Sequence, residues 1–254
     1  MNEMKGNSMA VFNSNDIYPV SADSELPFEQ HRDIFHLTGI DQEETILLLY
    51  PPSKDDKTRE ILFIRKSDNH TKVWEGEKLS KKQANELSGI DSIYFIDDFK
   101  DILSSIATKV DTFYINKNEH YRANSPVETR EDRFISWLLK KYPAHNVAKS
   151  NPILQRQRSI KHPDEIDQIK KACNITRKGF NRVLEFIKPN VWEYEIEAEF
   201  IHEFINSSSK GFAYSPIIAS GNDNNVLHYI KNNKQCKSGE LILMDVGAEY
   251  GNYS

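Results

Sequence analysis

Short apolar runs that alternate with helical segments limit what residues 1–145 of this chain can fold into. Five segments are short, apolar and bounded by polar or proline-containing turns, as strands are: 8–12, 45–52, 60–66, 92–96 and 111–117. Three other segments carry helix start and stop signals or apolar residues at helical spacing: 80–90, 97–109 and 130–143. Because strands that alternate with helices form layered structures, we expect an α/β domain here.

Two helices are predicted to open a second domain. Pro163 suits the first position of a helix, and the acids Asp164 and Glu165 would then lie at its positive end. The helical pattern ends at Pro189, and a second helix is expected over 193–207. Three strand-like segments follow these helices: 212–220, 226–229 and 240–250.

Composition and charge narrow the class of protein. The chain holds 33 Lys and Arg residues against 38 Asp and Glu residues, a net charge of −5, whereas nucleic-acid-binding proteins normally show a basic excess. Two cysteines, Cys173 and Cys236, do not suggest a disulfide framework. The sequence shows neither a signal peptide nor an apolar stretch of membrane-spanning length. We therefore expect a cytoplasmic protein with no nucleic-acid and no membrane partner.

Asp245 is a candidate metal ligand. It directly follows four apolar residues, Leu241 to Met244, which predict a buried strand. A buried carboxylate without a partner costs free energy, and a bound cation is a common remedy. Carboxylate oxygens suit divalent cations. The competing interpretation is that Asp245 only caps a turn beside Gly247.

His228 is a candidate catalytic residue. It follows the Gly-Asn-Asp-Asn-Asn loop at 221–225 and precedes Tyr229. Taken alone, a histidine in this setting is more often structural than catalytic, so both interpretations stay open. The two histidines of HRDIFH, at 31–36, fall on different faces of a helix or strand. We expect the residues of that segment to be ordinary polar surface residues.

Several longer segments carry a resemblance to a known family. In the second half they are PILQRQRSIKHPDEIDQIKKACNITRKGF, FAYSPIIASGNDNNVLHYIKNN and SGELILMDVGAEYGNYS. In the first half they are DIFHLTGIDQEETILLLYP and VWEGEKLS, where Lys78 and Ser80 depart from the family's pattern. In this order and spacing they resemble the Xaa-Pro aminopeptidases (aminopeptidase P), metallopeptidases with the pita-bread fold that are related to prolidases, methionine aminopeptidases and creatinases.

The resemblance implies two domains. Residues 1–150 would form an N-terminal α/β domain of the creatinase/aminopeptidase P type with a mixed sheet. Residues 151–254 would form the opening part of an α+β pita-bread catalytic domain. Family members bind two divalent ions, typically manganese, through two aspartates, one histidine and two glutamates. Asp245 matches the first aspartate, and the other ligands would lie beyond residue 254, so we expect a truncated chain that is inactive by itself.

The resemblance also assigns roles to individual side chains. His228 matches a histidine that stabilises the oxyanion or holds the proline residue when metal-activated water attacks the peptide carbonyl. Phe212 and Tyr214 are expected to shape the substrate pocket, with packing on the sheet as the alternative. Trp74 matches a tryptophan near the mouth of the active site that often reaches a neighbouring subunit. That match implies a homo-oligomer, a dimer or tetramer, with core or interface packing of Trp74 as the alternative.

The expected function is removal of the N-terminal residue from peptides with proline in the second position. A prolidase, which cleaves only Xaa-Pro dipeptides, shares the metal ligands and is the near alternative. A pita-bread protein that has lost its metals and serves as a binding module is an alternative of another class. The presence of Asp245 and His228 argues against that third interpretation.

Overall fold

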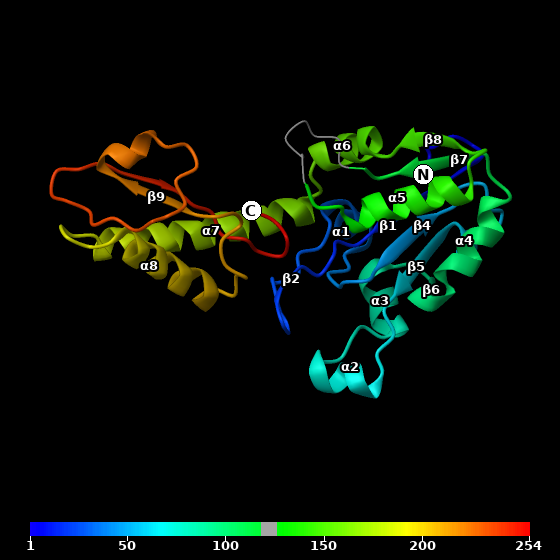
Figure 1. Cartoon of the computed structure of the whole chain (residues 1–254), viewed down its shortest axis with the longest axis horizontal. Coiled ribbons are helices and arrows are strands. Elements are labelled where there is room, and N and C mark those ends of the chain that lie inside the picture. The colour runs from blue at the N-terminus through cyan, green and yellow to red at the C-terminus, as the bar shows by residue number, and fades with distance from the viewer. Residues whose placement is uncertain (118–125) are drawn as a thin grey trace. The chain divides into compact units, whose positions relative to one another are not determined.

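The chain forms two compact units (Figure 1). The computed structural model describes residues 1–117 and 126–254. The first unit is Met1–Ile160 and the second is Lys161–Ser254. Each unit has its own hydrophobic clusters, so the apolar side chains of each unit pack around a core of that unit.

A six-stranded mixed sheet forms the centre of the first unit. Its strands are β1 (Ser8–Asn13), β4 (Ile46–Leu49), β5 (Glu60–Ile64), β6 (Ser92–Phe95), β7 (Thr112–Ile115) and β8 (Asn146–Lys149). They lie in the order β6-β5-β4-β1-β7-β8. Strand β4 is antiparallel to β1 and β5, whereas the β5–β6, β1–β7 and β7–β8 pairs are parallel. The expected mixed sheet is confirmed.

Helices cover both faces of this sheet. The α-helices of the unit are α1 (Arg32–Thr38), α2 (Asn69–Trp74), α3 (Lys81–Ser88), α4 (Phe99–Ala107), α5 (Arg130–Lys141) and α6 (Asn151–Ser159). Smaller elements are the hairpin of β2 (Pro19–Ser21) and β3 (Ser24–Glu25) and the 3-10 turns η1 (Asp56–Thr58) and η2 (Ile96–Asp98). The result is a three-layer α/β/α arrangement.

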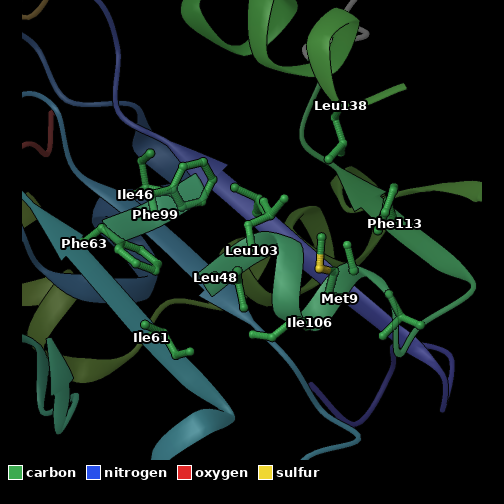
Figure 2. Packing of buried hydrophobic residues seen from close by; sticks show 13 residues of the cluster. Met9, Ile46, Leu48, Ile61, Phe63, Phe99, Leu103, Ile106, Phe113 and Leu138 are labelled. Carbon is green, nitrogen blue, oxygen red and sulfur yellow. The ribbon is translucent and has the colours of Figure 1, made fainter. Parts of the chain in front are cut away.

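Helices α4 and α5 cover one face of the sheet (Figure 2). Phe99 and Leu103 from α4 and Leu138 from α5 pack against alternate strand residues such as Met9 and Phe63. Strand side chains point to opposite faces in turn, so every second residue of β1 and β5 belongs to this cluster. All five of these side chains are buried, as the apolar spacing predicts.

Helices α1, α3 and α6 cover the opposite face. Ile34, Ala84 and Leu154 contribute one buried side chain each to the second cluster of this unit. The packing of Leu154 explains where the first unit ends. Helix α6 belongs to it, so the division falls after Ile160 rather than after the expected residue 150.

Local capping signals account for the helices that the sequence predicts. Ser80 and Gln83 form a capping box at the start of α3, and Gly89 ends it in the left-handed conformation. Thr129 and Asp132 form the same box at the start of α5. Strand β8 and helices α1, α2 and α6 were not predicted, because they are short and their apolar faces are defined only by neighbouring elements.

The second unit packs two antiparallel helices against a small sheet. Helix α7 spans Pro163–Phe186 and α8 spans Glu193–Asn206, in agreement with the two predicted helices. Strands β9 (Ile217–Ser220) and β10 (Ile242–Asp245) pair antiparallel, and the 3-10 turn η3 (Gly221–Asn225) follows β9. The core between helices and sheet is rich in aromatic side chains from α8.

Two predictions for the second unit are wrong. Residues 226–229 were expected to form a strand, but they follow η3 as a turn without a strand partner. Residues 241–244 were expected to be a buried strand. Instead, Leu241 is 80% exposed and Leu243 is also exposed, because helices cover only one face of β10. Asp245 is consequently exposed and does not enter the interior.

The two cysteines differ in burial. Cys236 is buried in the core of the second unit, although its neighbours in sequence are polar, and Cys173 is exposed on α7. Both thiols are free. None of the helices in the described ranges 1–117 and 126–254 is long and apolar enough to cross a membrane.

Candidate functional site

The open face of the β9–β10 sheet carries the candidate metal ligand. In the register of the two strands, Asp245 pairs with Ile217 and Leu243 pairs with Ala219. Residues of a strand alternate between faces, so these four side chains share one face. Ile218 lies on the other face, in the core shared with the helices. The sheet therefore presents Asp245 on the side that α7 and α8 leave uncovered.

Tyr214 orients the Asp245 carboxylate. Its hydroxyl donates a hydrogen bond of 2.7 Å to Oδ1 of Asp245. Partial burial, together with the bond to Asp245 and the charge of that carboxylate, raises the pKa of Tyr214 to about 12. The hydroxyl thus keeps its proton at neutral pH and remains a donor. Two residues that the sequence identified separately are brought together by the fold.

The approach of Tyr214 depends on a small residue after β10. A Cβ added to Gly247 would lie 3.4 Å from Cε1 of Tyr214, so the ring lies directly against the Gly247 backbone. The amide of Ala213 also donates to the Gly247 carbonyl at 2.8 Å. The segment before β9 is therefore anchored to the segment after β10, which fixes Tyr214 over Asp245.

These residues do not complete a metal centre. Asp245 is an exposed carboxylate held by a hydrogen bond, which is the usual state of a metal-ligating carboxylate. Within residues 1–117 and 126–254, however, no group of three or more His, Cys, Asp or Glu side chains lies close enough to hold an ion. The described residues therefore offer one oriented carboxylate, the candidate ligand, without a second and third ligand beside it.

His228 lies in the loop that crosses the open face. Its neighbour Tyr229 is buried and packs with Ile217 and Ala219, the same face that carries Asp245. His228 itself is exposed, and Leu227 beside it is 87% exposed. The loop that carries the candidate catalytic histidine is thus anchored, through Tyr229, on the face of the candidate ligand.

Glu193 is a buried residue of this site that sequence reasoning missed. It is the first residue of α8 and is 0% exposed. Its carboxylate accepts bonds from Ser220 at the end of β9 and from Tyr229 and Lys234 in the loop. An acid in the first turn of a helix is ordinarily a surface residue that interacts with the helix dipole. No sequence signal distinguishes this buried acid from that common case.

Phe212 packs in the core. Its ring contacts Phe204 at a centroid distance of 5.1 Å and lies 6.4 Å from Phe200, both on α8. It also forms an isolated β-bridge with Ala248. Of the two roles left open for Phe212, these contacts favour packing, whereas Tyr214 is more exposed and contacts Asp245.

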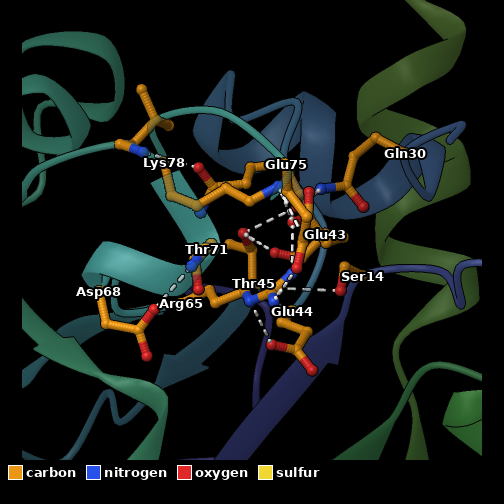
Figure 3. Close-up of polar contacts among 12 residues, drawn as sticks. Ser14, Gln30, Glu43, Glu44, Thr45, Arg65, Asp68, Thr71, Glu75 and Lys78 are labelled. Atoms are coloured by element: carbon orange, nitrogen blue, oxygen red, sulfur yellow. Dashed lines mark hydrogen bonds and ion pairs between the residues drawn. The ribbon is translucent and has the colours of Figure 1, made fainter. Parts of the chain in front are cut away.

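Trp74 is exposed at the end of α2 in the first unit. It is 76% exposed, and its ring stacks on His70 at 6.0 Å. Both ends of α2 are anchored (Figure 3). Asp68 accepts from the Thr71 amide at 2.7 Å, and Glu75 binds Arg65 through two hydrogen bonds of 2.6 and 2.7 Å. These contacts hold α2 in place at both ends. Trp74 at its C-terminal end is exposed to solvent and is not a core residue.

The charged cluster behind α2 is defined by Arg65, Lys78, Glu43, Glu44 and Glu75 (Figure 3). Burial alone would raise the pKa of Glu43, but hydrogen bonds from Lys78 and Arg65 outweigh it and hold that pKa below its ordinary value. Lys78, the basic residue that departs from the family pattern, contacts Glu43 at 2.6 Å and Glu75 at 3.3 Å. It is thus a structural cation of the first unit.

The HRDIFH segment is not an ordinary polar surface. His31 caps the start of α1 by accepting from the Asp33 amide. Asp33 is buried, and its carboxylate binds Arg158 at 2.7 Å and Asn116 at 3.0 Å. The prediction is wrong for Asp33 because its partners are distant in sequence.

Comparison with known families matches both halves of the chain. Residues 1–114 match the family described as aminopeptidase P, N-terminal domain. Residues 167–254 match metallopeptidase family M24. The two matches stand in the order that the resemblance implies and cover most of both units.

Known relatives and solved structures agree with these matches. The chain is 29% identical over 240 residues to Xaa-Pro aminopeptidase of Escherichia coli K12, covering 92% of this chain and 53% of that protein. It is 28% identical over 243 residues to human Xaa-Pro aminopeptidase 3, covering 94% and 47%. The structure of Pseudomonas aeruginosa aminopeptidase PepP aligns with a TM-score of 0.85 at 27% identity, covering 98% of this chain and 56% of that one. The chain thus spans about half the length of the curated relatives it matches.

An α/β domain followed by a helix-backed sheet with an oriented aspartate defines the class: an aminopeptidase P N-terminal domain joined to M24 metallopeptidase sequence. Zinc-substituted E. coli aminopeptidase P in complex with product shares this fold, with a TM-score of 0.85, 27% identity, and coverage of 98% of this chain and 57% of that one. The chain is thus similar to Xaa-Pro aminopeptidases along more than nine tenths of its length, with an aminopeptidase P N-terminal domain match followed by a metallopeptidase family M24 match.

Proposed function

We propose that the complete protein containing this chain is a metal-dependent aminopeptidase that removes the N-terminal residue from peptides with proline in the second position. The observation that carries the proposal is the Tyr214–Asp245 pair on the open sheet face beside the His228 loop. Asp245 and His228 are the residues that the family resemblance proposes as a metal ligand and a catalytic residue. The relatives named Xaa-Pro aminopeptidase lend it support.

The proposed cofactor is a pair of divalent ions, most simply manganese. Asp245 would supply one oxygen ligand, and Tyr214 would hold that carboxylate in a single orientation. The remaining ligands would come from outside the described residues, which offer no group of three. Bound ions would supply a nucleophilic water and charge stabilisation. We propose that residues 1–254 alone bind manganese weakly and hydrolyse no peptide.

The proposal assigns His228 to the oxyanion or to the proline residue of the substrate. Its exposed position in a loop anchored on the Asp245 face is consistent with substrate contact. Tyr214 would contribute to the substrate pocket as well as to ligand orientation. A pocket role for Phe212 is weaker, because its ring packs on α8.

Trp74 is proposed to contact a neighbouring subunit near the active-site mouth. The exposure of Trp74, on a helix that hydrogen bonds hold in place, supports a contact outside its own unit. The proposal includes a homo-oligomer, a dimer or tetramer, located in the cytoplasm, with a proline-containing peptide as substrate and no nucleic-acid or membrane partner. Size-exclusion chromatography with light scattering, comparing wild type with Trp74→Ala, tests the oligomer.

Peptide hydrolysis by the complete protein tests the activity. With manganese, we expect cleavage of a Xaa-Pro-Xaa tripeptide, no cleavage of the same tripeptide with alanine replacing proline, and loss of cleavage after chelation. Cleavage of Xaa-Pro dipeptides only would support a prolidase. Absence of hydrolysis together with absence of metal binding would support the metal-free binding module and refute the proposal.

Tyr214→Phe tests the orientation of Asp245. Loss of a hydrogen bond to a metal ligand typically weakens metal affinity about 10- to 100-fold. We expect such a loss in manganese titrations of the complete protein. Tyr194→Phe, which alters an exposed tyrosine of α8 stacked on Trp192, is the matched control. Equal affinity in both variants would contradict the assigned role.

A further inference from the structure

The Glu193 carboxylate is a fully buried charge with four donors. Oε1 accepts from the Ser220 amide at 2.8 Å and from the Ser220 hydroxyl at 2.7 Å. Oε2 accepts from the Tyr229 hydroxyl at 2.7 Å and from the Lys234 amide at 2.9 Å. Each oxygen therefore receives two hydrogen bonds. Charge-assisted bonds of this kind offset the cost of burying a carboxylate.

Three of these donors, from Ser220 and Lys234, come from the two ends of one loop, and the fourth, the Tyr229 hydroxyl, comes from its middle. Ser220 is the last residue of β9, directly before η3, and Lys234 lies where the chain returns from the open face. The Glu193 amide in turn donates to the Lys234 carbonyl at 2.9 Å. One side chain and its own backbone thus join α8 to both ends of the segment 221–234.

A second acid of the same helix reinforces this attachment. Glu197, one turn after Glu193, accepts from the Asn232 amide group at 2.9 Å. Asn232 is buried, has a φ of 41° and accepts from the Ile218 amide at 3.0 Å. The loop is therefore held by α8 and β9 together, in addition to internal contacts such as the ion pair of Lys234 with Asp223.

The anchored residue next to His228 is Tyr229. Its ring packs on Ile217 and Ala219, and its hydroxyl reaches Glu193. Burial and the bond to Glu193 raise the pKa of Tyr229 above its ordinary value, so the hydroxyl stays a donor. His228 is exposed beside it. The backbone that Tyr229 fixes therefore also carries the exposed imidazole of His228.

We propose that Glu193 is a positioning residue for His228, acting through Tyr229 to hold the 226–234 loop against the sheet face that carries Asp245. This inference rests on the proposed function for the role of His228. The attachment of the loop is independent of that role, so the two can be tested separately.

Hydrogen exchange on this chain tests the attachment. In Glu193→Gln, the carboxamide NH₂ must face either the Ser220 amide or the Lys234 amide, because both carboxylate oxygens accept from a backbone N–H. We expect amide exchange in 226–234 to accelerate about tenfold or more, with α7 unchanged. Glu195→Gln is the matched control, since its carboxylate in the same helical turn accepts from the Trp192 amide at the start of its own helix. Equal exchange in both variants would overturn the proposal.

A double-mutant cycle on the complete protein tests the connection to His228. We expect Tyr229→Phe to lower kcat/KM for a Xaa-Pro-Xaa peptide about tenfold, and less than about twofold when His228→Ala is already present. A general loss of folded protein would instead lower activity equally in both backgrounds, which would contradict positioning. If wild type hydrolyses no such peptide, the proposed function fails, and the exchange result alone decides whether Glu193 holds the loop.

Discussion

Gly179 on α7 lies directly against two phenylalanine rings of α8, and replacing it with alanine should destabilise the second unit. A Cβ at this position would lie 2.7 Å from Cε1 of Phe204 and 2.8 Å from Cδ1 of Phe200. Both distances are far below van der Waals contact, so one of the rings or the helix must move. The glycine sets how closely α7 can approach α8.

The surrounding rings limit that movement. Phe200 and Phe204 are fully buried, and their ring centroids lie 5.7 Å apart. Both rings also lie near the ring of Phe212. Forcing a methyl group into a packed core costs about 1–3 kcal/mol. Alanine in a helix interior recovers about 1 kcal/mol relative to glycine. The net expectation for Gly179→Ala is destabilisation by up to about 2 kcal/mol.

Residue-resolved hydrogen exchange measures this effect. A loss of about 2 kcal/mol corresponds to exchange about 30-fold faster for the most protected amides of α7 and α8. Asn181→Ala is the matched control, because Asn181 is exposed on the same helix and its replacement adds only helix propensity. It should be neutral or slightly stabilising.

A second substitution checks the cause. Phe204→Leu should relieve the overlap, so Gly179→Ala combined with Phe204→Leu should cost less than the sum of the single changes. If Gly179→Ala stabilises the protein as Asn181→Ala does, the close approach is not a constraint and the reasoning is refuted.

Three further predictions concern the first unit. Burial raises the pKa of Glu131 to about 6. The folded state therefore binds the proton of Glu131 more tightly than the unfolded state does. As pH rises from about 4.5 to 7, the free energy of unfolding should fall by at most about 2 kcal/mol. Glu131→Gln should flatten this part of the pH profile measured by urea unfolding. Arg65→Met should lower the free energy of unfolding at pH 7 by about 1–3 kcal/mol, because Arg65 is an ion-pair partner of Glu43. The loss should be smaller in acid, where Glu43 takes up a proton in both proteins. An equal loss at every pH would contradict a role for charge. Ser80→Ala removes the N-cap of α3 and should cost about 1 kcal/mol in thermal unfolding, whereas an unchanged Tm would contradict the capping role.

The elements that the sequence predicts best are those whose signals are local. Helix α3 begins and ends at its capping serine and glycine, and α7 begins at Pro163, as expected. Strand β4 coincides with an uninterrupted apolar run. These signals lie within a few residues of the structure they specify, so they are readable without knowledge of neighbours.

The elements that were missed or misassigned depend on distant partners. The segment 226–229 has the apolar character of a strand, but no strand pairs with it, and Tyr229 is instead drawn to Glu193. Leu243 was also expected to be buried, but it is exposed because helices cover only one face of β10. Strand pairing and burial depend on which elements of the tertiary structure lie next to a segment. The periodicity of apolar residues in the sequence does not identify those elements.

The same division applies to the candidate site. The sequence by itself determined the family resemblance, the order of the elements, and the identity of Asp245 and His228 as candidate residues. Only the tertiary structure decided that Tyr214 binds Asp245 and that Glu193 is buried beneath the His228 loop. The physical reason is sequence separation: a carboxylate at residue 193 acquires its donors at residues 220, 229 and 234 only after α8 packs on β9. Burial of that charge is therefore a consequence of packing and not of the residues beside it.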